Sequence, residues 1–243
     1  MGVVRDHLRK MTRNRCKQVL LAKLTDSPVQ DGSPKRMRVL DVGAGSCWLL
    51  SLLPTQHTRV GVDIAWRRRG VEESWVDPVG RASLEFVRGD ATRTPFADNT
   101  FDLVYSNEFM SHVWDIDDAL KEQMRVLKKG GVLIMMDGNF LNPAVVAEQL
   151  VVRTSKSSRL AGRRNAIQWL LHRDEPTPTF EDSRGVMRGY MDENVHSHYW
   201  WRKKLKSFSG EVRVEVRTFC TYLPFSWLGS IANNKVLVVG RRL

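Results

Sequence analysis

The chain of 243 residues has few cysteines and no long apolar run, and these shortages exclude several classes of protein. Cys16, Cys47 and Cys220 are odd in number and far apart, so they predict neither a disulfide framework nor a CxxC metal site. Apolar runs such as 132–136 are much shorter than the ~20 residues that a membrane-spanning helix needs. The N-terminal residues alternate basic and apolar side chains and lack the apolar centre of a secretory signal. We therefore expect a cytoplasmic protein with no membrane span and no bound metal.

The net charge of +11 is distributed unevenly along the chain. Residues 1–38 carry +7, residues 39–150 carry −5, residues 151–210 carry +6 and residues 211–243 carry +3. Basic flanks around an acidic centre favour an anionic partner, such as a phosphate group or nucleic acid. Solvated surface lysines and arginines give the same composition. The charge alone is compatible with both interpretations.

Short apolar segments alternate with helical patterns in the first part of the chain, which predicts βαβ units and a parallel sheet. We expect strands at 38–42, 59–63, 84–87, 101–105 and 132–136, and helices at 46–53 and 117–127. The predicted domain has four parts: basic helices at 1–36, a core at 37–139, a basic helical cap at 140–210, and an antiparallel strand pair at 211–243.

The residues after the first strands have the pattern of a nucleoside site. The first strand runs into Asp41-Val42-Gly43-Ala44-Gly45, where glycines let the backbone approach a ligand closely. The following helix offers unpaired N–H groups to an anionic ligand. Asp63 ends the second strand, where a carboxylate accepts hydrogen bonds from both hydroxyls of a ribose. Asp90 ends the third strand, where it can accept a hydrogen bond from the exocyclic amine of an adenine.

The tract GDATRTPFADNTFDLVYSNEFMSHVWDIDDALKEQMRVLKKGGVL begins at Gly89. Together with the glycine loop it resembles the small methyltransferase-domain type of class I S-adenosylmethionine-dependent methyltransferases, over about residues 37–139. The resemblance implies an α/β fold with a Rossmann-like, doubly wound sheet of seven strands in the order 3-2-1-4-5-7-6, strand 7 being antiparallel. It also implies S-adenosyl-L-methionine as the cofactor. The cofactor-binding residues that it implies are Asp41, Gly43, Ala44, Gly45, Asp63, Ile64, Asp90, Ala91, Ser106 and Asn107.

One position departs from the pattern, because the family commonly has a third glycine where this chain has Cys47. A side chain there tightens the packing between helix and sheet and leaves the first two glycines unobstructed. We interpret Cys47 as a packing residue, not as a nucleophile.

Methyl transfer from a sulfonium is expected to be an in-line displacement, so the protein mainly aligns the reactants and excludes water. A hydroxyl acceptor also needs a general base. The candidates are His112, just past the fourth strand, and His196 and His198 in an aromatic-rich tract. Each of the three also suits a packing role, and Tyr199 or Trp200 in the same tract suits stacking on a planar or sugar acceptor. Glu108 is a further polar candidate in the cleft.

We expect transfer to a small or medium-sized acceptor, such as a sugar, a lipid-linked molecule or a secondary metabolite, with an anionic group as one option. The cap should set this specificity. An alternative is RNA methylation by the basic flanks, although no RRM or KH signature is present. An alternative of another class is a non-catalytic cofactor-binding protein with a regulatory or assembly role. The sequence favours no oligomeric state. Basic residues of the predicted cap are Arg153, Lys156, Arg159, Arg163, Arg164, Arg202, Lys203, Lys204 and Lys206.

Overall fold

The structure is a computed structural model. It describes residues 10–11, 14–22, 36–64, 84–113, 115–147, 177–181, 187–190, 195–220 and 233–243. Most of the predicted cap, with its arginines and lysine between 153 and 164, lies outside the described residues.

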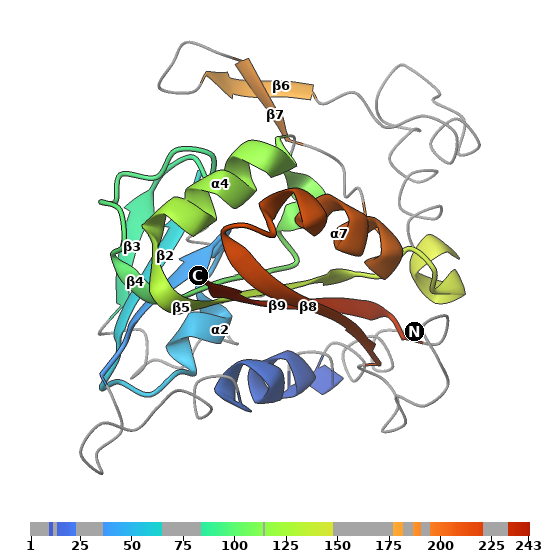
Figure 1. Cartoon of the computed structure of the whole chain (residues 1–243), viewed down its shortest axis with the longest axis horizontal. Helices are drawn as coiled ribbons and strands as arrows, with labels where there is room; N and C mark the ends of the chain where they lie inside the picture. Colours follow the sequence, from blue (N-terminus) through green and yellow to red (C-terminus); the bar gives the residue numbers. More distant parts are fainter. Residues whose placement is uncertain are drawn as a thin grey trace.

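A seven-stranded sheet forms the centre of the fold, with the order β3-β2-β1-β4-β5-β9-β8 (Figure 1). Counted along the chain, this is the order 3-2-1-4-5-7-6, so the predicted topology is confirmed. β9, which is the seventh strand of this sheet along the chain, is antiparallel to both of its neighbours, as expected. The strands are β1 (Arg38–Val42), β2 (Thr58–Asp63), β3 (Leu84–Arg88), β4 (Phe101–Asn107), β5 (Leu127–Gly138), β8 (Val212–Phe219) and β9 (Lys235–Arg242).

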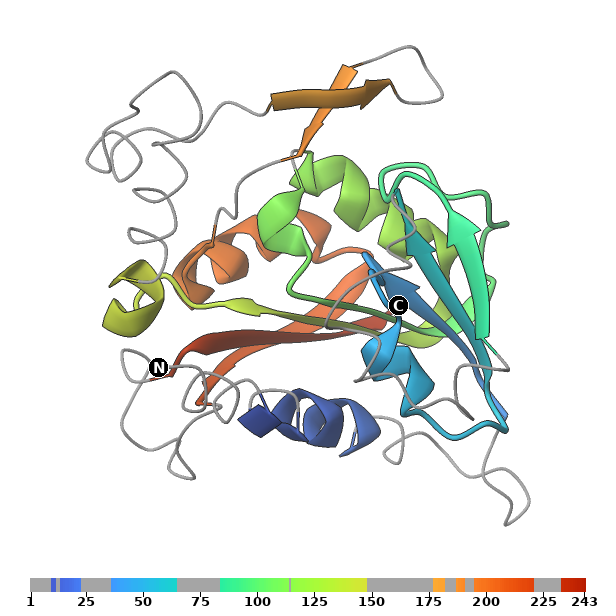
Figure 2. The ribbon, with the colours of Figure 1, turned by 180° about the vertical axis from the view of Figure 1, so that it is seen from behind.

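Helices cover both faces of the sheet, as Figure 1 and the reverse view in Figure 2 show. One core lies under α4 (Ile116–Val126) and α7 (His198–Leu205), and Leu120 and Trp201 contribute to it. The second core lies under α2 (Trp48–Ser51) and the helical residues 14–22, which contribute Cys16 and Leu20. Because side chains alternate between the two faces of a strand, strands covered on both faces are apolar throughout, which explains the short apolar runs of the sequence.

Polar side chains define where two of these helices begin. The Asp115 side chain accepts a hydrogen bond from the backbone N–H of Asp118 at 2.9 Å, which caps α4. The Ser197 hydroxyl accepts one from the N–H of Trp200 at 3.2 Å and caps α7. α7, which falls within the predicted cap, therefore has a fixed start and packs on the sheet. Two short 3₁₀ helices, η2 (Met110–His112) and η3 (Lys206–Phe208), follow β4 and α7.

Two expectations from the sequence need correction. The strand expected at 132–136 is longer, because β5 starts at Leu127 and includes residues 128–131, with an irregularity where it pairs with β4. The cap is not helical throughout, because β6 (Thr177–Glu181) and β7 (Met187–Tyr190) form an antiparallel pair. Pro178 explains this difference, since proline lacks the amide hydrogen that a helix interior needs.

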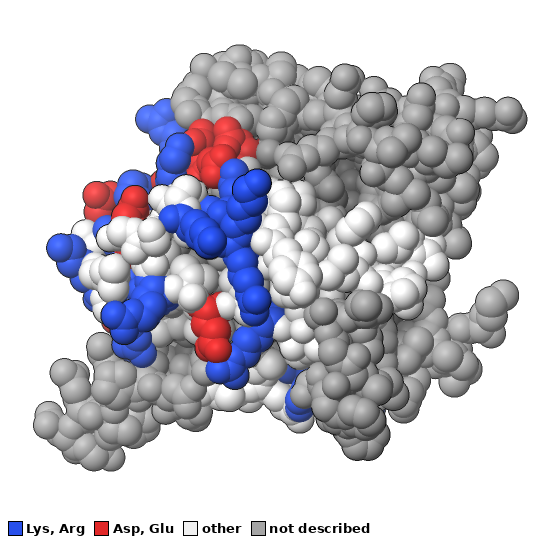
Figure 3. Space-filling model, turned by 45° about the vertical axis from the view of Figure 1, so that its right-hand side comes forward, with Lys and Arg blue, Asp and Glu red and all other residues white. Residues whose placement is uncertain are grey.

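Exposed charges of both signs occur on the described surface. Figure 3 shows a band of Lys and Arg side chains, with Asp and Glu side chains at its upper end and beside its lower part. Within the part of the chain that the structure describes, no helix has both the length and the apolar character to cross a membrane.

Candidate active site

The parallel pairing of the first strands brings their carboxyl ends to one edge of the sheet. Val42 pairs with Val62, so the glycine loop after β1 lies next to the end of β2. The N–H of Gly89 donates to the carbonyl of Asp63 at 2.9 Å, which places the start of the Asp90 segment beside β2. Since open α/β sheets bind ligands at this edge, the strand ends form a candidate cofactor site.

The glycine loop folds back on β2 through three backbone donors. The N–H groups of Gly43 and Ala44 both donate to the carbonyl of Val62, at 2.9 and 3.1 Å. The N–H of Gly45 donates to the Asp63 carboxylate at 2.9 Å, so the loop and the acid are in direct contact. Gly43 and Gly45 have φ values of 73° and 51°, which glycine adopts at little cost.

The two glycines differ in what surrounds them. A Cβ atom at Gly43 would lie 2.0 Å from the ring of Phe109, so this glycine makes room for a protein side chain. A Cβ atom at Gly45 would have no described protein atom within 4 Å. The backbone at Gly45 therefore faces open space next to Asp63, where a ligand has access to both.

Cys47, at the position where the resemblance implies a third glycine, also has a left-handed backbone with φ 58°. Its buried side chain faces Gly61 in β2, where a Cβ atom would lie 2.7 Å from the Cys47 sulfur. The absence of a side chain at Gly61 thus makes room for the side chain at Cys47. The Cys47 side chain therefore packs the glycine loop against the sheet.

Asp41 is buried beneath the loop, and its carboxylate accepts a hydrogen bond from the Tyr105 hydroxyl at 2.8 Å. Burial raises the pKa of Asp41 to about 7, and the nearby charge of Asp63 adds to the rise, while the Tyr105 hydrogen bond opposes it. Asp41 therefore links β1 to β4 below the site.

Three further residues implied by the resemblance carry buried oxygen atoms that have no hydrogen-bond partner among the described residues. They are one carboxylate oxygen of Asp90, the hydroxyl of Ser106 and the side-chain oxygen of Asn107. The other carboxylate oxygen of Asp90 accepts from the N–H of Thr92 at 2.9 Å, which orients the side chain. Buried acceptors without partners are costly, so these atoms favour a ligand that donates hydrogen bonds. Of the two remaining residues, Ile64 follows β2 and Ala91 packs against the core.

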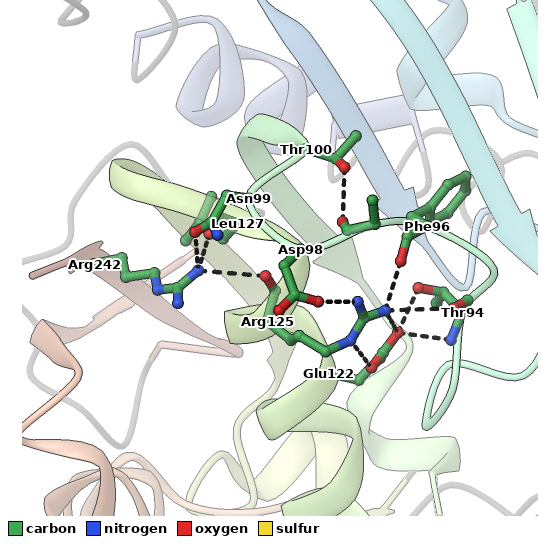
Figure 4. A network of polar contacts seen from close by, with 10 residues as sticks. Thr94, Phe96, Asp98, Asn99, Thr100, Glu122, Arg125, Leu127 and Arg242 are labelled. Carbon is green, nitrogen blue, oxygen red and sulfur yellow. Dashed lines mark hydrogen bonds and ion pairs between the residues drawn. The ribbon is translucent and has the colours of Figure 1, made fainter.

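A network around Arg125 fixes the segment that follows Asp90 (Figure 4). The Arg125 guanidinium donates to the Glu122 carboxylate at 2.7 and 2.8 Å and to the Phe96 carbonyl at 2.8 Å. Glu122 also accepts from the N–H and hydroxyl of Thr94, at 2.7 and 2.5 Å. Burial would raise the pKa of Glu122, but the hydrogen bonds from Arg125 and Thr94 outweigh it and lower the pKa. Arg125 and Glu122 therefore hold the connection between β3 and β4 in place, and their side chains point to this connection and not to the candidate site.

An ion cluster that sequence reasoning missed lies at the ends of β4 and β5. Lys235, at the start of β9, is buried and forms an ion pair with Glu108, which follows β4 with a φ of 54°. Buried Asp137 accepts from the N–H groups of Ser111 and Gly138, at 2.8 and 2.9 Å. Burial raises the pKa of Asp137 to about 6, and the charge of Glu108 adds to this rise. No spacing pattern in the sequence indicates a contact between residues 127 apart. The one signal is the lysine that begins the apolar run 235–239.

The three candidate histidines have different surroundings. His112 is partly buried and ends η2, directly after the Glu108 segment. His196 is buried at the tip of β5, where it forms a bridge with Asn139, and its ring stacks on Trp200 with the ring centres 3.7 Å apart. His198 begins α7, and burial lowers its pKa, as does the charge of Arg202. His196 lies in an extended bridge and His198 in a helix, so the two histidines do not share one extended segment.

Comparison with known proteins gives related sequences and related folds. Residues 40–135 match the family described as a methyltransferase domain. The chain is 33% identical over 101 residues to the uncharacterized methyltransferase YcgJ of Bacillus subtilis, covering 41% of this chain and 40% of that protein. It is 33% identical over 106 residues to a demethylmenaquinone methyltransferase of Renibacterium salmoninarum, covering 44% and 43%. The chain thus spans less than half the length of these curated relatives.

A solved methyltransferase of Haloferax volcanii, in complex with the Trm112 methyltransferase activator, has a similar fold. The TM-score is 0.54 at 20% identity, and the match covers 90% of this chain and 85% of that one.

Proposed function

We propose that the chain is a class I S-adenosylmethionine-dependent methyltransferase that transfers a methyl group to a small or medium-sized acceptor, since residues 40–135 match the methyltransferase-domain family. The observation that carries the proposal is the convergence of the glycine loop, Asp63 and Asp90 at one sheet edge, with open space at Gly45. The named relatives, which include demethylmenaquinone methyltransferases, support an acceptor of this size.

The residues present fit S-adenosylmethionine. The open position at Gly45 leaves room for a ligand against the backbone, and the Asp63 carboxylate beside it is an acceptor suited to ribose hydroxyls. The Asp90 oxygen that lacks a partner among the described residues is an acceptor suited to the adenine amine. When bound, the cofactor supplies an activated methyl group on a sulfonium. Ser106 and Asn107 are the last two residues of β4, and their oxygens without a described partner suit the part of the cleft near the transferred methyl.

The protein's own contribution is alignment, exclusion of water and removal of a proton. For an acceptor that loses a proton we propose His112 as the base, because it is partly exposed and lies directly after β4. His196 and His198 are both buried, and the stack of His196 on Trp200 suits the packing of the acceptor wall. A base of this kind contributes ~10²–10⁴-fold to the rate.

The cofactor assignment is tested by titrating S-adenosylmethionine into the full chain and into Asp63→Ala by calorimetry. Hydrogen bonds to a charged group contribute ~1.5–3 kcal/mol, so the variant should bind about 10- to 150-fold more weakly. Asp118→Ala, which changes a carboxylate on the outside of α4, is the matched control and should bind like the native chain. Equal affinity of Asp63→Ala in a sample that still unfolds cooperatively would contradict the ribose assignment.

The acceptor is tested with methyl-labelled cofactor and two fractions of the source cell, small molecules and RNA. Label in the small-molecule fraction supports the first proposal. Label in RNA supports the second candidate, RNA methylation, which the exposed Arg202 and Lys203 of α7 favour. Cofactor binding without label in either fraction would favour a non-catalytic binding protein instead.

A further inference from the structure

The solvent-facing side of α7 and the start of η3 carry one aromatic and three cationic side chains in a row. Tyr199, Arg202 and Lys203 belong to α7, and Lys206 is the first residue of η3 directly after it. All four are exposed, and their spacing of three, four and seven residues puts them on one side of this helical stretch. We call these four residues the α7 stripe. Tyr199 is 61% exposed, and among the described residues only Leu243 is another exposed large apolar side chain.

Among the described residues, no acid forms an ion pair with a cation of this stripe. The inner lysine of the helix, Lys204, pairs with Asp117 of α4, whereas Lys203 has no ion pair among the described residues. Arg202 donates to the Val216 carbonyl of the neighbouring strand β8 at 3.1 Å. The exposed Arg213 of β8 alternates with valines that pack in the core under α7, so it faces the other side of the sheet and is not part of the stripe. Between residues 198 and 220 the chain has six basic and two acidic residues.

The α7 stripe starts beside the candidate site. His196, two residues before α7, is bridged to Asn139 at the tip of β5, and Ser197 caps the helix. Tyr199 is in the first turn of α7, so the aromatic end of the stripe is the end nearest to the carboxyl end of β5. The cations continue away from the site along the helix.

We infer that the α7 stripe binds single-stranded nucleic acid, with the cations on successive phosphates and the Tyr199 ring stacked on a base. Single strands are bound through this combination of a cationic track and an exposed aromatic ring. Only the further idea that the bound strand is the methyl acceptor rests on the proposed function; the binding itself is independent of methyl transfer.

Two other anionic partners fit the surface less well. A membrane surface needs a broad apolar face on the helix, and the outer face of α7 has a single apolar residue. A duplex offers phosphates but no free base for Tyr199. The exposed ring therefore favours the single strand.

The test is fluorescence anisotropy with labelled 20-nucleotide oligouridine and oligothymidine, using the full chain without cofactor between 50 and 200 mM salt. Three cations on phosphates give a log–log salt slope of about −2.1, which is a loss of affinity of about 18-fold over this range. Lys203→Ser/Lys206→Ser should reduce the slope to about −0.7 and the loss to about threefold. Lys121→Ser/Lys129→Ser removes the same charge from exposed lysines elsewhere and should keep the native slope.

Stacking is tested separately from charge. Tyr199→Ala should weaken binding about tenfold without changing the salt slope, and Tyr199→Phe should retain native affinity. The ratio of the affinities for oligouridine and oligothymidine then shows whether the bound strand is RNA or DNA.

Three results would overturn the inference. The first is no binding of either oligonucleotide at 50 mM salt, and the second is an unchanged salt slope in Lys203→Ser/Lys206→Ser. The third is that the native chain binds a duplex as tightly as the single strand while Tyr199→Ala binds the single strand with native affinity. Binding to phosphatidylglycerol vesicles but not to the oligonucleotides would overturn it in favour of a membrane surface. Cofactor affinity of the same variants, measured by calorimetry, keeps this outcome separate from that of the proposed function.

Discussion

Replacing Arg125 by methionine should loosen the connection between Asp90 and β4. The guanidinium makes a two-point contact with Glu122 and also donates to the Phe96 carbonyl and to Asp98. In the variant the Glu122 side chain, which is only 8% exposed, keeps its Thr94 donors but loses its positive partner.

The magnitude follows from the burial of the pair. Breaking a buried ion pair costs about 3–5 kcal/mol, but the Arg125 side chain is 34% exposed and solvent reduces the loss. We therefore expect the free energy of unfolding to fall by about 2–3 kcal/mol, which for a domain of this size lowers Tm by roughly 5–10 °C. Cofactor affinity should also fall, because the fixed segment begins at Asp90.

The assay is urea unfolding at several pH values, with Lys121→Met as the control. The control changes an exposed lysine of the same helix, whose pair with Asp118 contributes about 0.5 kcal/mol or less. The pKa of Glu122 is lowered in the folded protein, so its stabilisation is present above its ordinary pKa of 4.5 and is lost as pH falls. The difference between native chain and Arg125→Met should thus be largest near neutral pH. Equal stability of Arg125→Met and the control at pH 7 would refute the reasoning.

Two further substitutions test the residues beneath the glycine loop. Because the pKa of Asp41 is raised to about 7, its contribution to stability is full below pH 3.8 and is lost as pH rises through 7; Asp41→Asn should remove this loss, so that in urea unfolding the variant gains on the native chain between pH 5 and 8. An unchanged pH profile would contradict the burial of an ionisable group there. Gly61→Ala should cost about 1–3 kcal/mol by crowding Cys47, and adding Cys47→Gly should restore part of it. Additive losses in the double variant would exclude the contact.

Most of the sheet could be predicted from the sequence because its strands are covered on both faces and therefore apolar. The ends of β1 and β2 were marked by glycines and by Asp63, whose local spacing carries the cofactor pattern. The pair Glu108–Lys235 could not be predicted, since its members meet only after β9 has inserted beside β5. The pair β6–β7 was missed because its short segments lack a clear alternation and lie in a stretch read as helical.

The insertion of β9 between β5 and β8 has a consequence for folding during synthesis. β9 is translated after every other strand of this sheet, yet it occupies an inner position with a partner on each side. Until it has left the ribosome, the edge of β5 and all of β8 lack their hydrogen-bonding partners, and the nascent chain exposes Ile134, Met136 and Val216. Unpaired strand edges of this kind promote aggregation. A ribosome that stalls before residue 235 therefore holds a sheet of five strands with an open, apolar flank, which is the state that a chaperone would recognise.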